Sequence, residues 1–561
     1  MTVPRSNSDR LSPASVEHRD ERLRVSFTDI PHTPRLFVDF VCNFAQVSEF
    51  YGPMQRSDRP LSAWAEDVAG RARWRRLLVD VLRDQNRRFG GDDVTQANID
   101  RLADSGCVAI VTGQQAGLFT GPLLTLYKAL TAITVAAELQ RQGIAAVPVF
   151  WINSEDHDFD EVNHCGVVGR DGQWTEIRYA GAEEDLGKPV ADLVLTGDID
   201  RAIGELLAAL PNSEFLPQIE ADLRSSYRAG TRFVEGFARL LMRMLGGTGL
   251  ILFDPSDARL KPALVPLFRQ VLAQSRPLGA ALRKQTEMLQ NRGYRPPIHL
   301  TEDSTFLFFR EQGKRYPLVW MGDRVGVKGG ATTFTEQEVL DLIAEEPHRF
   351  SPNVALRPLV QDTLLPTLVY IGGPTEIAYF AQLTPLYPAC DVIEPAIWPR
   401  ASLTLVESRY AAMMAKYALR LTDLFAGADA ARAVVVERSL KHDHLDLFNR
   451  AEEVVAEQLA HLRQILVEVD PTLDRPALKA IEKVRHQIAS LRRHYIDARA
   501  HRDAILTQQI QRLTTILTPG RKLQERELNG FYFFARYGYS ILERIRREIE
   551  VPSLDHRLIF L

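Results

Sequence analysis

The sequence predicts an α/β protein with a parallel sheet followed by a long helical hairpin, and two observations carry this prediction. Between Gly106 and Pro399, short apolar runs alternate with stretches of helical periodicity, which is typical of a parallel sheet flanked by helices. From about Leu403 onwards, strand signals almost disappear and apolar residues recur at heptad spacing. The first pattern indicates an α/β core, and the second indicates an antiparallel coiled coil.

Length and composition narrow the class of protein. The chain has 561 residues, of which 45% are hydrophobic and 25% charged, with a formal net charge of −4. Such a length predicts roughly two to four domains, and the lack of basic excess argues against nucleic-acid binding. Residues 1–24 are polar, unlike a secretory signal, and no apolar run approaches the ~20 residues of a membrane span. Four scattered cysteines favour a reducing cytoplasm and buried core roles over disulfides or structural zinc; they are Cys42, Cys107, Cys165 and Cys390.

The chain is expected to fall into three regions. Residues 1–105 should form a helical segment that packs on the core, and residues 106–402 should form the core itself, with a β-rich insertion near 294–333. The expected strands are Cys107–Val111, Val147–Ile152, Gly249–Phe253, Thr305–Phe309 and Leu368–Ile371. The expected helices are Leu123–Gln142, Pro262–Ala273, Leu278–Asn291 and Thr335–Glu345. Within the insertion, Thr305–Phe309 and Tyr316–Trp320 should form hairpins.

The third region, residues 403–561, is expected to be helical, with its last segment returning to the core. Two runs of apolar residues follow heptad spacing, and the segment Asp470–Pro476 between them carries two prolines that should break a helix. These features predict a helical hairpin that offers an apolar seam to a second subunit, with an ordinary helical bundle as the alternative. The first run is Val455, Leu459, Leu462, Leu466 and Val469, and the second is Ile481, Val484, Ile488, Leu491 and Tyr495.

The segment Glu155–Glu161 holds five carboxylates and an imidazole directly after the apolar run Ala146–Ile152. Unpaired carboxylates are costly to bury, and like charges this close raise one another's pKa. The carboxyl end of a core strand is where open α/β sheets bind ligands. A solvated acidic turn is the alternative, but Trp151 before the segment and His157 and His164 beside it favour a functional site.

Two glycine-bearing turns follow other expected strands. Thr112–Pro122 precedes a helix that carries Lys128, and the first turn of a helix is a ready anion site. Its spacing matches neither Walker A nor GxGxxG, so taken alone it favours an ordinary tight turn; its place on the first strand of the sheet, whose next strand ends in the acidic segment, favours a nucleotide-binding crevice. Gly372 and Gly373 precede Pro374 and Glu376 in the same way. Glu376 could bind a ribose or an amine, or it could be a first-turn carboxylate favoured by the helix dipole.

Together these segments resemble one family, the cysteine ligases of bacillithiol biosynthesis (BshC). The match rests on Thr112–Pro122, on Phe150–Ile152 with Glu155–His164, and on Gly372–Tyr379, and it is reinforced by Leu36–Tyr51 and Gly520–Asn529. The resemblance implies a Rossmann-like core akin to the class I nucleotidyl-transferase superfamily, with connecting insertions. It also implies homodimerisation through the C-terminal coiled coil. The implied reaction joins cysteine to the amino group of glucosaminyl malate and gives bacillithiol.

This reaction requires an activated carboxylate, so the expected cofactor is ATP with Mg²⁺, and the intermediate is an acyl-adenylate or an acyl-phosphate. No resident metal is expected. Residues expected to bind ATP are Thr112, Gly113, Gln114, Gln115, Gly117, Lys128, Gly372, Gly373, Glu376, Arg400 and Lys522, with Arg400 as a mobile cation. Residues expected to orient the amine, act as base or hold Mg²⁺ are Asp156, His157, Asp158, Asp160 and Gln114.

One departure from the superfamily pattern and two alternative functions remain open. The His-x-Gly-His signature of the wider superfamily is absent, and the equivalent turn carries Gln114 and Gln115. A metal-dependent hydrolase could use Asp156, His157, Asp158 and His164 as ligands. A non-catalytic scaffold could instead act through the coiled coil alone.

Overall fold

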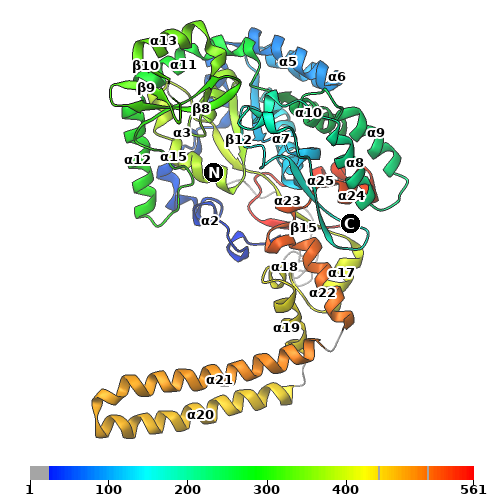
Figure 1. Ribbon diagram of the computed structural model, residues 1–561, viewed down its shortest axis with the longest axis vertical. Helices are drawn as coiled ribbons and strands as arrows, with labels where there is room; N and C mark the ends of the chain where they lie inside the picture. The colour runs from blue at the N-terminus through cyan, green and yellow to red at the C-terminus, as the bar shows by residue number, and fades with distance from the viewer. Residues whose placement is uncertain (1–23, 331, 440–441, 502–503) are drawn as a thin grey trace. The chain divides into compact units, whose positions relative to one another are not determined.

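The protein is described here by a computed structural model that covers residues 24–330, 332–439, 442–501 and 504–561 (Figure 1). Residues 1–23 of the predicted N-terminal segment lie outside this description. The chain divides into a first unit, 1–404 with 524–559, and a second unit, 405–523 with 560–561. The first unit therefore holds both the predicted core and the segment that follows the predicted coiled coil.

The core of the first unit is a five-stranded sheet in which all neighbouring strands are parallel. Its strands, in spatial order, are β13 (Ala396–Pro399), β12 (Thr367–Gly372), β2 (Val108–Gln114), β3 (Ala146–Ile152) and β6 (Ile251–Phe253). The chain runs outward from β2 to β6 and then crosses back to β12 and β13. The order therefore reverses between β2 and β12, which makes this the point where a Rossmann-like sheet binds ligands.

Helices surround this sheet (Figure 1). Three of the four expected helices are confirmed nearly to their ends, whereas the helix expected at Leu278–Asn291 begins three residues earlier. In chain order the helices are α2 (Arg35–Cys42), α3 (Pro53–Arg56), α4 (Leu61–Arg71), α5 (Arg75–Phe89), α6 (Asp93–Ala103), α7 (Leu123–Arg141), α8 (Asp198–Ala209), α9 (Leu216–Ser226), α10 (Phe233–Met244), α11 (Lys261–Ala273), α12 (Ser275–Asn291), α13 (Glu336–Glu345), α14 (Arg357–Leu364), α15 (Pro374–Leu383), α16 (Leu386–Ala389), α23 (Gln524–Glu527), α24 (Phe531–Tyr537) and α25 (Ile541–Arg547).

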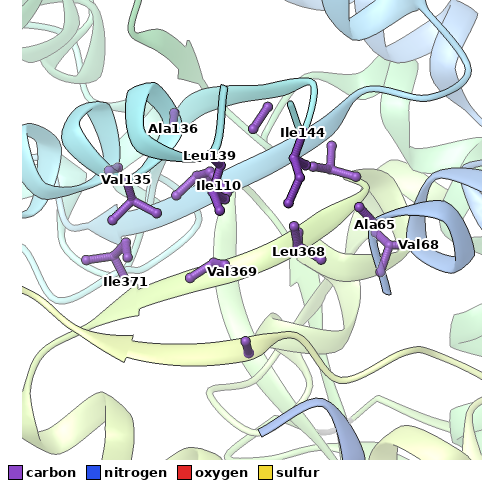
Figure 2. Packing of buried hydrophobic residues seen from close by; sticks show 14 of the residues in the cluster. Ala65, Val68, Ile110, Val135, Ala136, Leu139, Ile144, Leu368, Val369 and Ile371 are labelled. Atoms are coloured by element: carbon purple, nitrogen blue, oxygen red, sulfur yellow. The ribbon is translucent and has the colours of Figure 1, made fainter. Parts of the chain in front are cut away.

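Strands β2, β3 and β12 are apolar on both faces because helices cover the sheet on both sides. Figure 2 shows Val135 and Leu139 of α7 beside Ile110 of β2, while Val68 of α4 lies beside Leu368 of β12. Each of these residues is buried in one hydrophobic cluster. This packing fixes the strand ends, and the strand ends position the site.

A second, antiparallel sheet forms the predicted β-rich insertion. Its strands, in spatial order, are β10 (Thr333–Thr335), β9 (Arg324–Val327), β8 (Lys314–Met321), β7 (Ser304–Glu311) and β11 (Phe350–Pro352). The expected hairpin is confirmed, since β7 pairs with β8 through a turn in which Gln312 and Gly313 both have positive φ. The sheet extends beyond the predicted limit at residue 333 because β11 joins it. A separate hairpin of β4 (His164–Val168) and β5 (Trp174–Arg178) follows the acidic segment.

The second unit is helical and contains the predicted hairpin. Its helices are α17 (Ser408–Lys416), α18 (Leu421–Leu424), α19 (Ala428–Ser439), α20 (His442–Val469), α21 (Asp474–His501) and α22 (Ala504–Leu517). Helices α20 and α21 lie side by side (Figure 1), joined by a turn that Asp470 closes by accepting a hydrogen bond from the Thr472 N–H. The predicted break at this segment is confirmed. Several apolar side chains of the pair are exposed in the single chain, including Leu462 and Val469, and dimerisation through them stays a prediction.

Two expectations need correction. The region after residue 403 is not free of strands, because β14 (Ser402–Val406) and β15 (His556–Phe560) lie within it, and β15 pairs with β1 (Arg24–Val25). Strands this short give no readable periodicity. Cys42 is exposed, although the other three cysteines are buried as expected. No helix in the described ranges is long and apolar enough to cross a membrane.

Candidate active site

A cavity of about 740 Å³ lies at the carboxyl ends of β2, β3 and β12, where the strand order reverses. We call it the main cavity. The core strands, the insertion sheet, α14, α15 and α23 all contribute to its walls. Its charged and amide-bearing lining residues are Gln114, Gln115, Lys128, Asn153, Glu155, Asp156, Glu161, Arg315, Lys328, Asn353, Arg357, Glu376, Arg400 and Arg526, and it is also lined by His157 and His299.

Lys128 of α7 ties the two glycine-bearing turns together. Its Nζ donates to the Gly113 carbonyl (2.7 Å) and to Gln114 Oε1 (2.9 Å), and it lies 2.5 Å from Glu376 Oε2. The lysine side chain is only 4% exposed and the glutamate 16%. Three acceptors surround the ammonium group, so Lys128 positions the turns of β2 and β12.

Glu376 has both carboxylate oxygens occupied. Oε1 accepts from the Tyr370 hydroxyl (2.5 Å), and Oε2 accepts from the Gly373 N–H (2.7 Å) as well as from Lys128. Burial alone would raise the pKa of Glu376, but Lys128 and these donors outweigh it and hold the pKa below its usual value. Glu376 is therefore an ionised first-turn carboxylate of α15, in a helix that begins at Pro374.

The acidic segment is held against the turn of β2 by Gln115. The Gln115 amide donates to Asp156 Oδ2 (2.9 Å) and to Glu161 Oε2 (2.8 Å). Asp158 does not line the main cavity. Its carboxylate accepts a hydrogen bond from the Glu161 backbone N–H. Asp160 does not line the cavity either, and accepts from the Asn163 amide. Of the predicted catalytic residues, the fold therefore brings Asp156, His157 and Gln114 together at the cavity.

His157 is fixed by Arg315, which comes from β8 of the insertion sheet. Arg315 Nη1 lies 3.2 Å from His157 Nδ1. Because a guanidinium can only donate, Nδ1 is the acceptor and the ring proton is on Nε2. Burial and then the charge of Arg315 lower the pKa of His157. In this arrangement His157 is a neutral donor at Nε2, so a carboxylate rather than this imidazole is suited to act as base.

Arg315 is itself rigidly held and was not singled out in the sequence. It donates to Ser351 Oγ (2.9 Å) and to the Pro352 carbonyl (2.6 Å), and its guanidinium lies 3.7 Å from the centroid of the Phe308 ring. Its position in an alternating strand pattern gave no signal of function. Only the fold of the insertion sheet brings it to the acidic segment.

Three further arginines line the main cavity from α14, from the end of β13 and from α23. Arg357 donates to the Tyr379 hydroxyl (3.1 Å), Arg400 donates to Glu525 (2.7 Å), and Arg526 lies on the neighbouring α23. Arg400 is 4% exposed and its partner Glu525 is fully buried, so Arg400 is a fixed cation and not the mobile one expected. Arg357 and Arg526 were missed, although Arg526 lies within the Gly520–Asn529 segment that matched the family.

The Arg400–Glu525 pair is supported by a buried polar cluster. Glu525 also accepts from the Ser402 hydroxyl (2.9 Å) and the Leu403 N–H (2.8 Å). The His556 ring lies between Ser402 Oγ and Thr404 Oγ1, at 2.8 Å from each. Burial lowers the pKa of His556 to about 4.

We expect this histidine to make the first unit acid-labile. Above its unfolded pKa near 6.5 the ring is neutral in both states, whereas below it the unfolded chain binds a proton that the buried ring refuses. Stability is therefore lost as pH falls from about 6.5 to about 4, by about 3 kcal/mol. Urea unfolding of the wild type and of His556→Asn at pH 7 and pH 4 checks this. The variant should lose less unfolding free energy between the two pH values, because it lacks the buried ring. Identical pH profiles for the two proteins would contradict the prediction.

Of the other predicted nucleotide-binding residues, Gly373 also lines the main cavity, whereas Thr112, Gly113, Gly117, Gly372 and Lys522 do not. Thr112 is buried and donates to the Ile371 carbonyl (2.9 Å). A Cβ on Gly117 would lie 2.8 Å from Gly121 Cα, so this turn requires glycine. Gly113 and Gly372 belong to the strand ends that Lys128 and Glu376 fix. Lys522 belongs to the second unit.

The predicted metal ligands of the hydrolase alternative do not converge. His164 Nδ1 lies 3.1 Å from the Asp160 carbonyl, and Asp158 is used within its own turn. Across the part of the chain that the structure describes, no group of three or more His, Cys, Asp and Glu side chains could hold a metal ion. The predicted ligand set for a hydrolase is therefore wrong.

Comparison with known families decides what kind of protein has this fold and site. The family model described as "Bacillithiol biosynthesis BshC, N-terminal Rossmann-like domain" matches residues 23–401, and "Bacillithiol biosynthesis BshC, C-terminal coiled-coil domain" matches residues 403–561. The chain belongs to the BshC family. The predicted resemblance is confirmed, as is the fold class of a Rossmann-like parallel sheet with a C-terminal coiled coil.

Curated BshC relatives align along nearly the whole chain. Proteins from Koribacter versatilis and Salinibacter ruber are each 34% identical to it, covering 93% and 94% of this chain and 96% of each relative. A third, from Solibacter usitatus, is 32% identical over 95% of this chain and 98% of its own length. All three carry the name "Putative cysteine ligase BshC". The structure also shows what Gln114 and Gln115 do in this BshC chain: they hold Lys128 and Asp156.

Proposed function

We propose that this chain is an ATP-dependent ligase that joins the carboxylate of cysteine to the amino group of glucosaminyl malate. The observation that carries the proposal is the polarity of the main cavity. Arg400 follows β13, with Arg526 next to its partner Glu525, and Arg357 contacts Tyr379 of α15 after β12, whereas the carboxylates of Asp156 and Glu161 follow β3, beyond β2 in the sheet. Membership of the BshC family and the names of its relatives supply the reaction class.

The arginine side of the cavity fits a nucleotide triphosphate. Gly373 lies at the N-terminus of α15, and a Cβ there would approach Arg400 Nε to 3.6 Å and Glu376 Oε2 to 3.4 Å. The Gly373 N–H is taken by Glu376, so phosphate oxygens here would be bound by the neighbouring guanidinium groups. ATP, with Mg²⁺ on its phosphates, would supply the activation that a free carboxylate lacks. The fixed guanidinium groups would stabilise the charge on the leaving phosphates without reorganising.

The carboxylate side fits an amine. Asp156 Oδ2 accepts a hydrogen bond from the Gln115 side-chain amide, and Oδ1 accepts one from the backbone N–H of His157 (2.8 Å). An ammonium group placed here would be attracted by Asp156 and Glu161. Asp156 would accept its proton as the amine attacks, and His157 would donate a hydrogen bond from Nε2. Because the family resemblance implies a core akin to nucleotidyl transferases, we favour an acyl-adenylate over an acyl-phosphate.

Product analysis tests this proposal. The purified protein is incubated with ATP, Mg²⁺, cysteine and glucosaminyl malate. We expect a new thiol whose mass equals the sum of the two substrates less water, with AMP and pyrophosphate formed in equal amount. Omission of any one component should abolish the product. No thiol product under these conditions would overturn the proposal, and ADP in place of AMP would show acyl-phosphate activation.

A cellular test separates the ligase from a scaffold. Cells that lack this chain should lose bacillithiol and accumulate glucosaminyl malate. Complementation by a chain in which Asp156 and His157 are both replaced by Asn should fail if the protein is an enzyme. Full complementation by that variant would support a scaffold that acts through the coiled coil.

A further inference from the structure

A second cavity, of about 360 Å³, lies off the carboxyl ends of β3 and β6. We call it the second cavity. Its walls come from the ends of these strands, from α5 and α10, and from the insertion sheet. Glu155 and Arg315 line both cavities. None of the roles proposed above for the ligase reaction uses the second cavity.

The floor of the second cavity is a fixed polar surface. Glu155 forms an ion pair with Lys261, whose side chain is only 3% exposed. Asp254, directly after β6, accepts from the Ser154 hydroxyl (2.5 Å) and the Ser256 N–H (3.0 Å). The fully buried Gln85 donates to the Asp254 carbonyl (2.8 Å) and accepts from its N–H (3.0 Å). These bonds hold the polar groups in place before any ligand enters.

Most carboxylates that line this cavity are already neutralised. Arg310 and Lys261 pair with two of them, and residues outside the lining pair with two more. The pairs are Glu155–Lys261, Asp192–Arg310, Glu235–Arg239 and Asp257–Arg259.

Two arginines of the lining have no such partner. Arg88 lies near the end of α5, and Arg232 precedes α10. Throughout the described ranges, no carboxylate oxygen lies within 4.0 Å of a side-chain nitrogen of Arg88 or Arg232. The cavity thus combines a polar floor, in which Asp254 is the one lining carboxylate without a cationic partner among the described residues, with two uncompensated guanidinium groups. Guanidinium groups bind carboxylates through paired hydrogen bonds, so this combination suits a hydroxylated diacid.

We infer that the second cavity binds the malyl part of the amine substrate, with its two carboxylates at Arg88 and Arg232. This inference rests on the proposed function. The sugar hydroxyls would face the floor around Asp254 and Ser256. The amino group would pass Glu155 to reach the carboxylates of the main cavity, so that nucleotide and amine substrate enter by separate spaces.

The test is calorimetric titration of glucosaminyl malate, without ATP, into the full-length protein. In R88Q/R232Q we expect its affinity to fall about tenfold for each arginine, or about 100-fold in all. Binding of ATP should be unchanged. In turnover, KM for glucosaminyl malate should rise while KM for cysteine stays the same. Glucosamine, which lacks the malyl group, should bind both proteins equally.

The matched control is R87Q/R228Q, which removes the same charge from two exposed arginines that do not line the cavity. It should bind glucosaminyl malate as the wild type does. If R88Q/R232Q does not fold, R88K/R232K keeps the charge but removes the paired geometry, and its affinity should be intermediate.

Two outcomes would overturn the inference, and they differ in what else they reject. Equal affinity of wild type and arginine variants, with ligase activity intact, rejects the second cavity and leaves the proposed function standing. A wild-type protein that neither binds nor converts glucosaminyl malate rejects both.

Discussion

Replacing Lys128 by Met should lower the free energy of unfolding of the first unit by on the order of 3–5 kcal/mol and should abolish the proposed ATP binding. The substitution leaves Glu376 buried without its cation and frees the Gly113 carbonyl and the Gln114 amide. Both turns at the strand ends then lose their shared anchor. The six tryptophans all lie in the first unit, so tryptophan fluorescence during urea unfolding reports on that unit alone.

Two variants make this result interpretable. Lys188→Met removes a lysine from a partly exposed pair with Asp185, and it should change stability little. The double variant Lys128→Met with Glu376→Gln removes both buried charges and should recover part of the loss. If Lys128→Met proved no more destabilising than Lys188→Met, the buried pair would not anchor the turns.

Replacing Asp156 by Asn should reduce kcat by about 10²–10⁴-fold, because it removes the group that we propose accepts the proton of the attacking amine. Replacing His157 by Gln should reduce kcat less than the aspartate change does. The imidazole Nδ1 already accepts from Arg315, and a glutamine carbonyl can take over that role. The rate of pyrophosphate release at saturating substrate concentrations measures kcat for both variants.

Asp158→Asn is the matched control for the aspartate change. Asp158 belongs to the same acidic segment but does not line the main cavity, so kcat should stay close to that of the wild type. A larger loss for His157→Gln than for Asp156→Asn would assign the base to the histidine and contradict the tautomer deduced from Arg315.

The elements of the fold that could be predicted are those whose signals are local. The apolar run Val147–Ile152 is a buried strand, as predicted. The predicted break at Asp470–Pro476 is also present, with Pro471 between the two helices and Pro476 in the first turn of the second. The strands β14 and β15 span five residues each and were missed, because a short apolar run has no period that separates it from a buried helix turn.

The candidate site could be predicted only where neighbours in sequence are also neighbours in space. Asp156 and His157 were found because they follow a core strand. Lys261 reaches Glu155 across 106 residues, and Arg315 reaches His157 across 158, so only the folded sheets bring these pairs together. Turn geometry decides which acidic side chains face the cavity, and spacing alone could not separate Asp156 from Asp158.

The position of Glu525 and Arg526 in the chain has a consequence for biosynthesis. Glu525 follows Arg400 by 125 residues, with nearly all of the second unit between them. A ribosome therefore makes the whole sheet and its glycine-bearing turns long before it makes the carboxylate that neutralises Arg400. A nascent chain that ends before Gln524 carries a guanidinium without its partner and lacks one wall of the main cavity. Completion of translation is thus the step that completes the cavity, and a truncated product lacks part of the proposed nucleotide site.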